Sequence, residues 1–201
     1  MKPRLSFAHL PTPIEAMPRL SSALEGPKLL VKRDDQTGLA FGGNKTRKLE
    51  YLLADAREQG AQTLITAGAV QSNHCRQTVA AAARFGFACT LVLFGDPPDP
   101  PDGNRLLHHL LGADIVFTDR DQVNETLKHV YKQAKADGQA PYLIPYGGSN
   151  PTGAMGYVNA MLELAEQQVQ PDWIVFASSS GGTQAGMLVG ACISGYQGQI
   201  L

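Results

Sequence analysis

The chain has 201 residues, with 17 basic and 18 acidic side chains and a formal net charge of −1. This balance argues against a nucleic-acid or membrane-surface role driven by charge, and no apolar stretch approaches the ~20 residues that span a bilayer. The N-terminus, MKPRLSFAHLPTPIE, has prolines and charges where a signal peptide needs an apolar run. Cys75, Cys89 and Cys192 form neither a CxxC pair nor an even framework, so we expect a soluble, cytoplasmic protein without a bound metal.

The first part of the chain predicts a strand and a helix joined by a glycine loop. The strand is KLLVKRDD (28–35), and the loop runs through GGN (42–44) to Lys45. The helix that Lys45 opens carries Leu49, Leu52, Leu53 and Ala56 on one stripe, and it ends at Gly60.

The middle of the chain alternates between strands and helices. The strands are expected at 63–68, 88–95, 114–118 and 141–145, and the helices at 73–86, 103–112 and 122–138. Strands separated by helices of this length imply crossover connections and a parallel sheet. We therefore expect one doubly wound unit.

The last part of the chain predicts a helix near 157–168, a strand at 173–179 and a helix at 183–195, and the closing GQIL resembles the start of another strand. The simplest topology is α/β, with a small parallel-sheet domain (46–145) inserted into a larger domain formed by 1–45 and 146–201. A strand–helix–strand unit cut at its second strand would leave apolar surface uncovered. We therefore expect the larger domain to be incomplete and the natural chain to continue.

Lys45 lies at the end of a helix that disfavours cations by ~0.3–1 kcal/mol. In a dry site its neutral amine would be favoured, and a neutral amine is what bond formation with a carbonyl requires. The alternative is a solvated lysine in a cationic turn, since Arg47 and Lys48 follow.

Two further segments lie between a strand and a helix. In TLITAGAVQSNH (63–74), Ser72, Asn73 and His74 open a helix at the carboxyl end of a strand, where free N–H groups accept a carboxylate or phosphate. Capping of the helix by Ser72 or Asn73, with His74 as an ordinary first-turn residue, is the alternative. In ASSSGGTQAG (177–186), consecutive small residues could wrap a phosphate or serve only tight packing.

Taken together, the three sites suggest one ligand with a phosphate, a carbonyl and a carboxylate. Pyridoxal phosphate holding an amino acid has all three groups. That cofactor supplies an electron sink for a carbanion once a protein orients it.

Four segments carry a resemblance to a known family: KRDDQTGLAFGGNKTRKLEYL, TAGAVQSNHCRQ, IPYGGSNPTGAMGY and ASSSGGTQAGM. They resemble the D-cysteine desulfhydrase/1-aminocyclopropane-1-carboxylate deaminase family of fold-type II pyridoxal-phosphate enzymes, relatives of the tryptophan synthase β-subunit. The resemblance covers the whole chain in the expected order, apart from a shortened loop near 95–103.

The resemblance implies roles for particular residues. Lys45 would bind the cofactor aldehyde covalently and return protons as a base, and Asn73 would hydrogen-bond the cofactor's phenolic oxygen. Ser72, Asn73 and His74 would hold the substrate carboxylate, with the Ser72 hydroxyl as a possible acid–base or nucleophilic group. The cofactor phosphate would be bound by Ser180, Gly181, Gly182 and Thr183.

The resemblance also orders the substrates. Members that open the cyclopropane ring usually carry Gln after the Ser-Asn pair, whereas the desulfhydrases and L-cysteate sulfo-lyases usually carry His, as at His74. D-cysteine is therefore the leading substrate, giving pyruvate, hydrogen sulfide and ammonia. L-cysteate and 1-aminocyclopropane-1-carboxylate are the alternatives.

The resemblance further implies a homodimer, and relatives continue past residue 201, where they supply the pyridine-nitrogen partner and active-site tyrosines. If the 201 residues were the whole molecule, we would expect weak or absent turnover and poor solubility. Two other classes stay open: a non-catalytic protein that binds the cofactor or a nucleotide, and an inert enzyme fragment.

Overall fold

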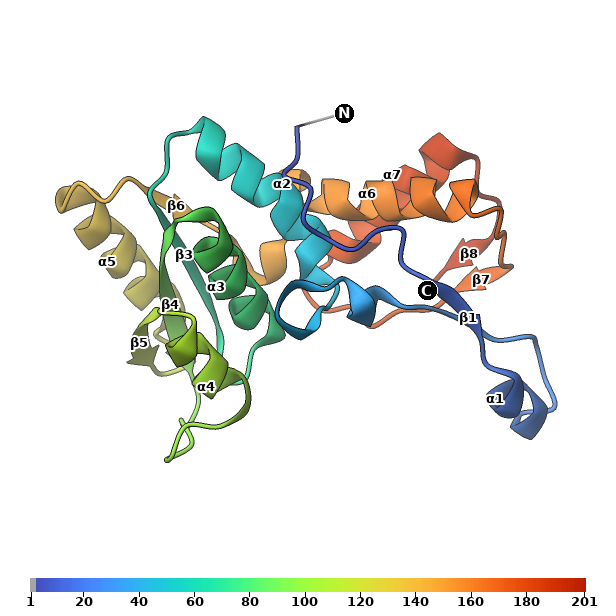
Figure 1. Ribbon diagram of the computed structural model, residues 1–201, viewed down its shortest axis with the longest axis horizontal. Coiled ribbons are helices and arrows are strands. Elements are labelled where there is room, and N and C mark those ends of the chain that lie inside the picture. The colour runs from blue at the N-terminus through green and yellow to red at the C-terminus, as the bar shows by residue number, and fades with distance from the viewer. Residues whose placement is uncertain (1–2) are drawn as a thin grey trace.

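The computed structural model describes residues 3–201, which form two lobes with helix α2 (Lys45–Glu58) between them (Figure 1). One lobe holds the parallel sheet, and the other holds two long helices and two pairs of short strands. Each lobe has its own cluster of buried apolar side chains.

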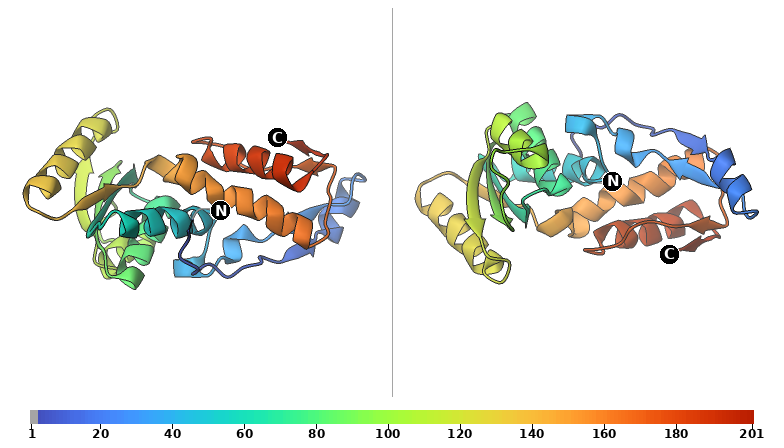
Figure 2. Two further views of the ribbon diagram at one scale, coloured as in Figure 1. Left: turned by 90° about the horizontal axis from the view of Figure 1, so that it is seen from above. Right: turned by 90° about the horizontal axis from the view of Figure 1, so that it is seen from below.

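The first lobe contains a four-stranded parallel sheet in the order β5-β4-β3-β6. Its strands are β3 (Thr63–Ala69), β4 (Ala88–Phe94), β5 (Asp114–Thr118) and β6 (Pro141–Leu143). Helices α3 (Asn73–Phe85) and α4 (Gly103–Leu110) lie on one side of the sheet, and α5 (Val123–Ala136) lies on the other (Figure 2). The predicted α/β class and parallel sheet are confirmed.

Local sequence explains why this lobe was predictable. The central strand β3 is buried on both faces from Thr63 to Gly68, as a continuous run of small and β-branched residues predicts. Helix α3 packs an alanine-rich face against β3 and β4, begins where the Ser72 side chain accepts the N–H of Cys75, and ends at the left-handed Gly86.

The second lobe is built around helices α6 (Pro151–Glu166) and α7 (Gly182–Ser194), which pack side by side (Figure 2). Strands β1 (Ile14–Ala16) and β2 (Leu30–Lys32) form an antiparallel pair, and the short helix α1 (Pro18–Ala23) lies in the connection between them. A parallel pair, β7 (Trp173–Ile174) and β8 (Gln199–Ile200), follows α6 and α7. Three 3-10 turns complete the chain: η1 (Asp34–Gln36), η2 (Leu39–Phe41) and η3 (Tyr146–Gly148).

Several predicted elements have different bounds: the strand expected at 141–145 ends at Leu143, the helix expected at 103–112 ends at Leu110, and three further differences have a local cause. Helix α6 begins at Pro151, not near 157, because Asn150 caps it by accepting the N–H of Gly153 and proline suits the first helical position. The strand expected at 173–179 is only β7, since its parallel partner β8 is two residues long. The strand expected at 28–35 stops at Lys32, because the 3-10 turn η1 starts at Asp34.

Helix α2 packs against α3 of the first lobe and against α6 of the second, so it contacts both lobes. The approach to α6 is so close that a Cβ atom on Gly156 would overlap the backbone of Arg47. The predicted division of the chain at 45/46 and 145/146 stays a prediction. Among residues 3–201, no helix is long and apolar enough to cross a membrane.

Candidate active site

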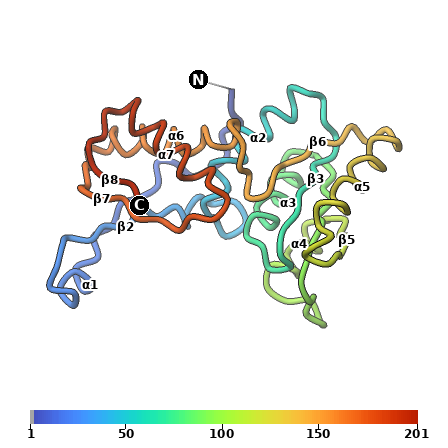
Figure 3. Tube along the Cα trace, turned by 180° about the vertical axis from the view of Figure 1, so that it is seen from behind, coloured from blue at the N-terminus to red at the C-terminus, as the bar shows by residue number. Residues whose placement is uncertain are grey.

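The candidate site lies at the carboxyl ends of the neighbouring strands β3 and β6, from which the chain continues into different lobes. After β3 the chain turns into α3, and after the neighbouring β6 it passes through η3 into α6 of the other lobe (Figure 3). Strand β4 lies on one side of β3 and β6 on the other, so the carboxyl ends of β3 and β6 form the point at which strand order reverses. Ligands of open α/β sheets bind at such points.

Lys45 is the first residue of α2, and its amine donates to the side-chain oxygen of Asn44 at 2.9 Å. Burial lowers the pKa of this amine, which increases its neutral fraction. Lys45 itself is half-buried, whereas Arg47 and Lys48, the basic residues that follow it, are each only 1% exposed and do not form a solvated turn.

Lys48 lies one helical turn after Lys45 and is a second buried amine in the site. Its Nζ donates to the carbonyl oxygen of Gly147 at 3.2 Å. Burial, together with the charge of Lys45, lowers the pKa of Lys48 to about 8. The sequence did contain a signal, since residues i and i+3 share a helix face.

The glycine turn before α7 faces these amines. Gly181 precedes the first turn of α7 with a left-handed φ of 77°, and the hydroxyl of Ser180 lies 2.6 Å from that of Ser149. Gly147 shows how close the parts are: a Cβ atom there would lie 2.6 Å from Ser180 Oγ and 3.8 Å from Lys45 Cε. The structure therefore brings Lys45 and the turn around one point.

Ser72, Asn73 and His74 begin α3 at the carboxyl end of β3. The Ser72 hydroxyl accepts the Cys75 N–H at 3.2 Å, so the capping role is real. Asn73 is exposed, whereas the His74 side chain is buried.

The hydrogen bonds of His74 define its tautomer. The Thr66 hydroxyl donates to the carbonyl oxygen of Ile144 at 2.9 Å, so it must accept from His74 Nε2, which lies 2.9 Å away. Burial and the charges of Lys45 and Lys48 lower the pKa of His74 to about 3. The ring is therefore neutral at physiological pH, so it could contact an anion as a neutral hydrogen-bonding group but not as a cation.

The charge of the site fits an anionic cofactor. No salt bridge in residues 3–201 joins Lys45 or Lys48 to a carboxylate, although both amines are largely removed from water. Buried charges are stable only when they are paired, and α7 adds the free N–H groups of its first turn beside Ser180. Lys45, Lys48 and this turn can accordingly hold a phosphate and an aldehyde.

Comparison with known proteins agrees with this geometry. Residues 5–192 match the family described as "Pyridoxal-phosphate dependent enzyme". The chain belongs to this family of pyridoxal-phosphate dependent enzymes. The cofactor named in this family's description carries an aldehyde and a phosphate, the two groups that Lys45, Lys48 and the turn before α7 can hold.

Two relatives with higher sequence identity show which members of the family this chain is similar to. It is 48% identical over 197 residues to "D-cysteine desulfhydrase" of Klebsiella pneumoniae (strain 342), with 94% of this chain and 60% of that protein covered. A solved structure titled "Crystal Structure Analysis of the ACC deaminase homologue" is 41% identical, with a TM-score of 0.91, 97% of this chain and 60% of that chain covered. The chain thus spans 60% of the length of these relatives.

A more distant structure shares the fold alone. The pyridoxal 5'-phosphate-dependent aspartate racemase is 21% identical with a TM-score of 0.75, and the match covers 94% of this chain and 56% of that chain. The predicted fold-type II architecture is confirmed by these matches together with the family.

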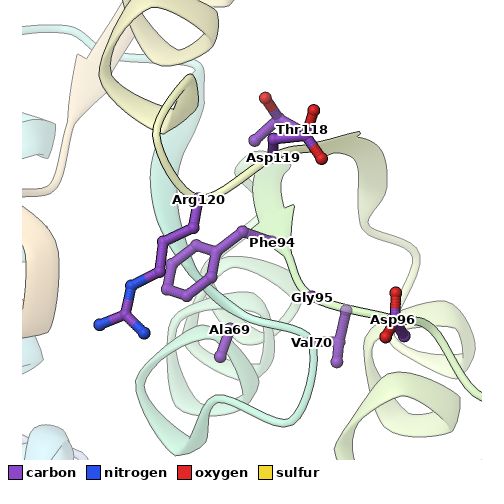
Figure 4. Close-up of a pocket in the computed structure, with 8 residues that line it drawn as sticks. All are labelled: Ala69, Val70, Phe94, Gly95, Asp96, Thr118, Asp119 and Arg120. Carbon is purple, nitrogen blue, oxygen red and sulfur yellow. The ribbon is translucent and has the colours of Figure 1, made fainter.

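A separate hollow of about 400 Å³ lies at the carboxyl ends of β3, β4 and β5 (Figure 4). Its lining contains none of the predicted site residues. The lining residues are Ala69, Val70, Phe94, Gly95, Asp96, Thr118, Asp119 and Arg120. The Arg120 guanidinium extends away from Asp96 in this view and lies 5.6 Å from the Phe94 ring centroid.

Proposed function

We propose that this protein is a pyridoxal-phosphate dependent lyase that releases sulfide from D-cysteine. The observation that carries the proposal is the half-buried Lys45 beside Gly147 and Ser180, with the first turn of α7 adjacent. The relative that is 48% identical is a D-cysteine desulfhydrase, and His74 occupies the position at which desulfhydrases usually carry histidine.

The proposed roles follow from the chemistry of each group. Lys45 holds the cofactor aldehyde and moves the proton at the substrate α-carbon, which its lowered pKa supports. The backbone N–H groups and hydroxyls of Ser180, Gly181, Gly182 and Thr183 bind the phosphate. Lys48 adds a cation beside them. When bound, pyridoxal phosphate draws electrons from the substrate α-carbon, so a β-substituent can leave.

The start of α3 would hold the substrate. We propose that the Ser72 hydroxyl and the N–H groups of Asn73 and His74 bind its carboxylate, since the Ser72 N–H already donates to the carbonyl oxygen of Ala69 at 2.9 Å. We propose further that the Asn73 amide donates to the phenolic oxygen of the cofactor. The neutral, buried His74 ring supports a backbone contact over a charged side-chain contact at this position. We also propose that the whole protein acts as a homodimer on a small amino acid, as the resemblance implies.

Covalent fixation tests the core of the proposal. Purified protein should be yellow with pyridoxal phosphate, and borohydride should fix the cofactor to Lys45 in a peptide map. Lys45→Ala should abolish fixation, whereas Lys128→Ala, at an exposed lysine of α5, should leave it intact. Lyase activity that survives in Lys45→Ala would exclude the mechanism. A colourless protein that binds nucleotides would instead support the non-catalytic alternative.

Product assays separate the substrates. D-cysteine should give sulfide faster than L-cysteate gives sulfite or 1-aminocyclopropane-1-carboxylate gives 2-oxobutanoate. The third assay has particular weight because the ACC deaminase homologue is 41% identical. If only 2-oxobutanoate forms, the substrate proposal is wrong while the cofactor proposal stands.

A further inference from the structure

Residues at the start of α4 form hydrogen bonds with the loop that follows β3. Gln71 Nε2 donates to Asp102 Oδ1 at 3.0 Å, and Gln71 Oε1 accepts the backbone N–H of Asn104 at 2.8 Å. The fit is close, because a Cβ atom on Gly103 would lie 2.7 Å from Gln71 Oε1. These hydrogen bonds connect residues that are 31 to 33 positions apart in the sequence, directly before the start of α3.

The side chain of Asn104 extends these hydrogen bonds to Asn73. Its Nδ2 donates to the carbonyl oxygen of Gln71 at 2.7 Å and to Asn73 Oδ1 at 2.9 Å. The amide nitrogen of Asn104 has two hydrogens, and both are donated. If a donor replaced either acceptor, the Gln71 carbonyl oxygen or Asn73 Oδ1, one of these hydrogen bonds would be lost.

Arg76 supplies the second donor to the same atom. Its Nη1 donates to Asn73 Oδ1 at 3.0 Å and to Asn104 Oδ1 at 3.2 Å, while its Nη2 donates to the carbonyl oxygen of Gly42 at 2.7 Å. Gly42 lies in the loop that leads to Lys45. The network therefore joins α4, the start of α3 and the lysine loop.

This network fixes which way the Asn73 amide faces. Two donors hold its Oδ1, whereas no hydrogen bond from its Nδ2 to another residue is found within residues 3–201. We infer that Asn104, assisted by Arg76, is a positioning residue that keeps the Asn73 amide nitrogen turned toward the cofactor. The inference rests on the proposed function, in which Asn73 donates to the phenolic oxygen.

The variant Asn104→Asp tests this orientation of the Asn73 amide. Aspartate keeps the size of the side chain and can still accept from Arg76, yet it places oxygen where Nδ2 donated to Asn73 and Gln71. The repulsion would turn the Asn73 amide over, so that its oxygen faces the phenolic oxygen. Asn124→Asp is the matched control, since Asn124 is exposed on α5 and lies outside the network.

The first readout is the pH at which the visible absorption band of the bound cofactor titrates. A donated hydrogen bond stabilises the negatively charged oxygen, so its loss should raise the titration pH by about one unit in Asn104→Asp. Asn124→Asp should titrate as the parent protein does. In an Asn73→Ala background, Asn104→Asp should cause no further shift. An unshifted titration in Asn104→Asp would overturn the inference.

The second readout needs no cofactor. Thermal melting of the cofactor-free Asn73→Ala, Asn104→Ala and double variants should be non-additive, because residues that share a hydrogen bond are coupled. If the parent protein binds no pyridoxal phosphate, the proposed function fails, and this cycle still decides whether Asn104 holds Asn73. Strictly additive melting temperatures would overturn the inference whether or not the cofactor binds.

Discussion

Lys48 is a buried amine whose hydrogen-bond acceptor within residues 3–201 is the carbonyl oxygen of Gly147. A neutral carbonyl does not offset a buried positive charge, and the pKa of Lys48 falls to about 8 through burial and the charge of Lys45. Its role as a phosphate partner should therefore depend on pH. Below pH 8 the ammonium attracts the phosphate, and above it the neutral amine does not.

Pyridoxine 5'-phosphate, which lacks the aldehyde, isolates this contact from the reaction of Lys45. The affinity of the protein for pyridoxine 5'-phosphate should fall by up to about tenfold per pH unit above pH 8. The decline should end at the pH where Lys48 in the complex, kept charged by the bound phosphate, also loses its proton. Lys48→Met should bind roughly 10- to 100-fold more weakly at pH 7, since a hydrogen bond to a charged group is worth about 1.5–3 kcal/mol. The change should also flatten the alkaline decline.

Two variants control the Lys48 experiment by calorimetry. Lys48→Arg keeps a charge that does not titrate in this range, so binding should become independent of pH above 8. Lys128→Met, at the exposed surface of α5, should behave as the parent protein does. An unchanged alkaline decline in Lys48→Met would assign the pH dependence to another group.

At the scale of elements, the contact between α2 and α6 sets where Lys45 points. Gly156→Ala should destabilise the protein by about 1–3 kcal/mol, because the new Cβ atom overlaps the Arg47 backbone and forces the helices apart. Without this contact the same change would stabilise a helix by about 1 kcal/mol. Displacement of α2 should also reduce borohydride fixation of the cofactor to Lys45.

Urea unfolding checks the Gly156 prediction. Ala165→Gly, at an exposed position of α6, is the reverse change, and it should cost up to about 1 kcal/mol without altering cofactor fixation. A Gly156→Ala protein that is more stable than its parent would show that the helices separate without cost.

Elements with strong local signals were predictable from the sequence. The strands and helices of the sheet lobe follow from apolar runs, an N-cap at Ser72 and a C-terminal glycine at Gly86. The pairing of β1 with β2 was not predicted, since it depends on residues that meet only in the folded chain. The early start of α6 did have a local signal, the Asn150-Pro151 pair, which the periodicity of the helix did not reveal.

The same distinction applies to the site. Lys45 stands out because a cation is disfavoured where a helix begins, and the turn at Ser180 stands out because a run of consecutive small residues can wrap an anion. Asn104 gives no such signal, because its importance arises from a contact with a loop about 30 residues earlier in the chain. Burial of Lys48 likewise depends on α6 and η3, which lie across the lobe boundary.

At the scale of the whole molecule, a buried ionic network fixes α2 to the second lobe. The Arg47 guanidinium forms paired hydrogen bonds with Asp34 of η1 and with Glu163 of α6, at distances of 2.8–2.9 Å. Glu163 also accepts from Lys32 of β2 at 2.6 Å and from the backbone N–H of Thr12 at 3.0 Å. Three segments, which contain Thr12, residues 32–34 and Glu163, are therefore joined to Arg47 of α2, the helix that carries Lys45.

Glu163→Gln tests whether this network determines the geometry of the site. Burial alone would raise the pKa of Glu163, but hydrogen bonds from Arg47 and Lys32 lower it to about 2. Because this pKa lies below the unfolded value of about 4.5, its contribution to stability is complete above pH 4.5 and is lost as the pH falls toward 2. At pH 7, Glu163→Gln should cost about 3–5 kcal/mol, because it leaves Lys32 without its ion pair and the buried Arg47 with Asp34 as its remaining carboxylate partner.

The matched control is Glu166→Gln, the same change at an exposed position one turn further along α6. Urea unfolding at pH 7 should separate the two variants. The deficit of Glu163→Gln should shrink as the pH is lowered below 4.5, because the unfolded parent protein then takes up a proton that the folded protein does not bind until the pH nears 2. Cofactor fixation to Lys45 should fall in Glu163→Gln and stay unchanged in Glu166→Gln, because only the first change releases α2 from the second lobe. Equal stability of the two variants at pH 7 would mean that the packing of α2 on α6 positions Lys45 without help from the network.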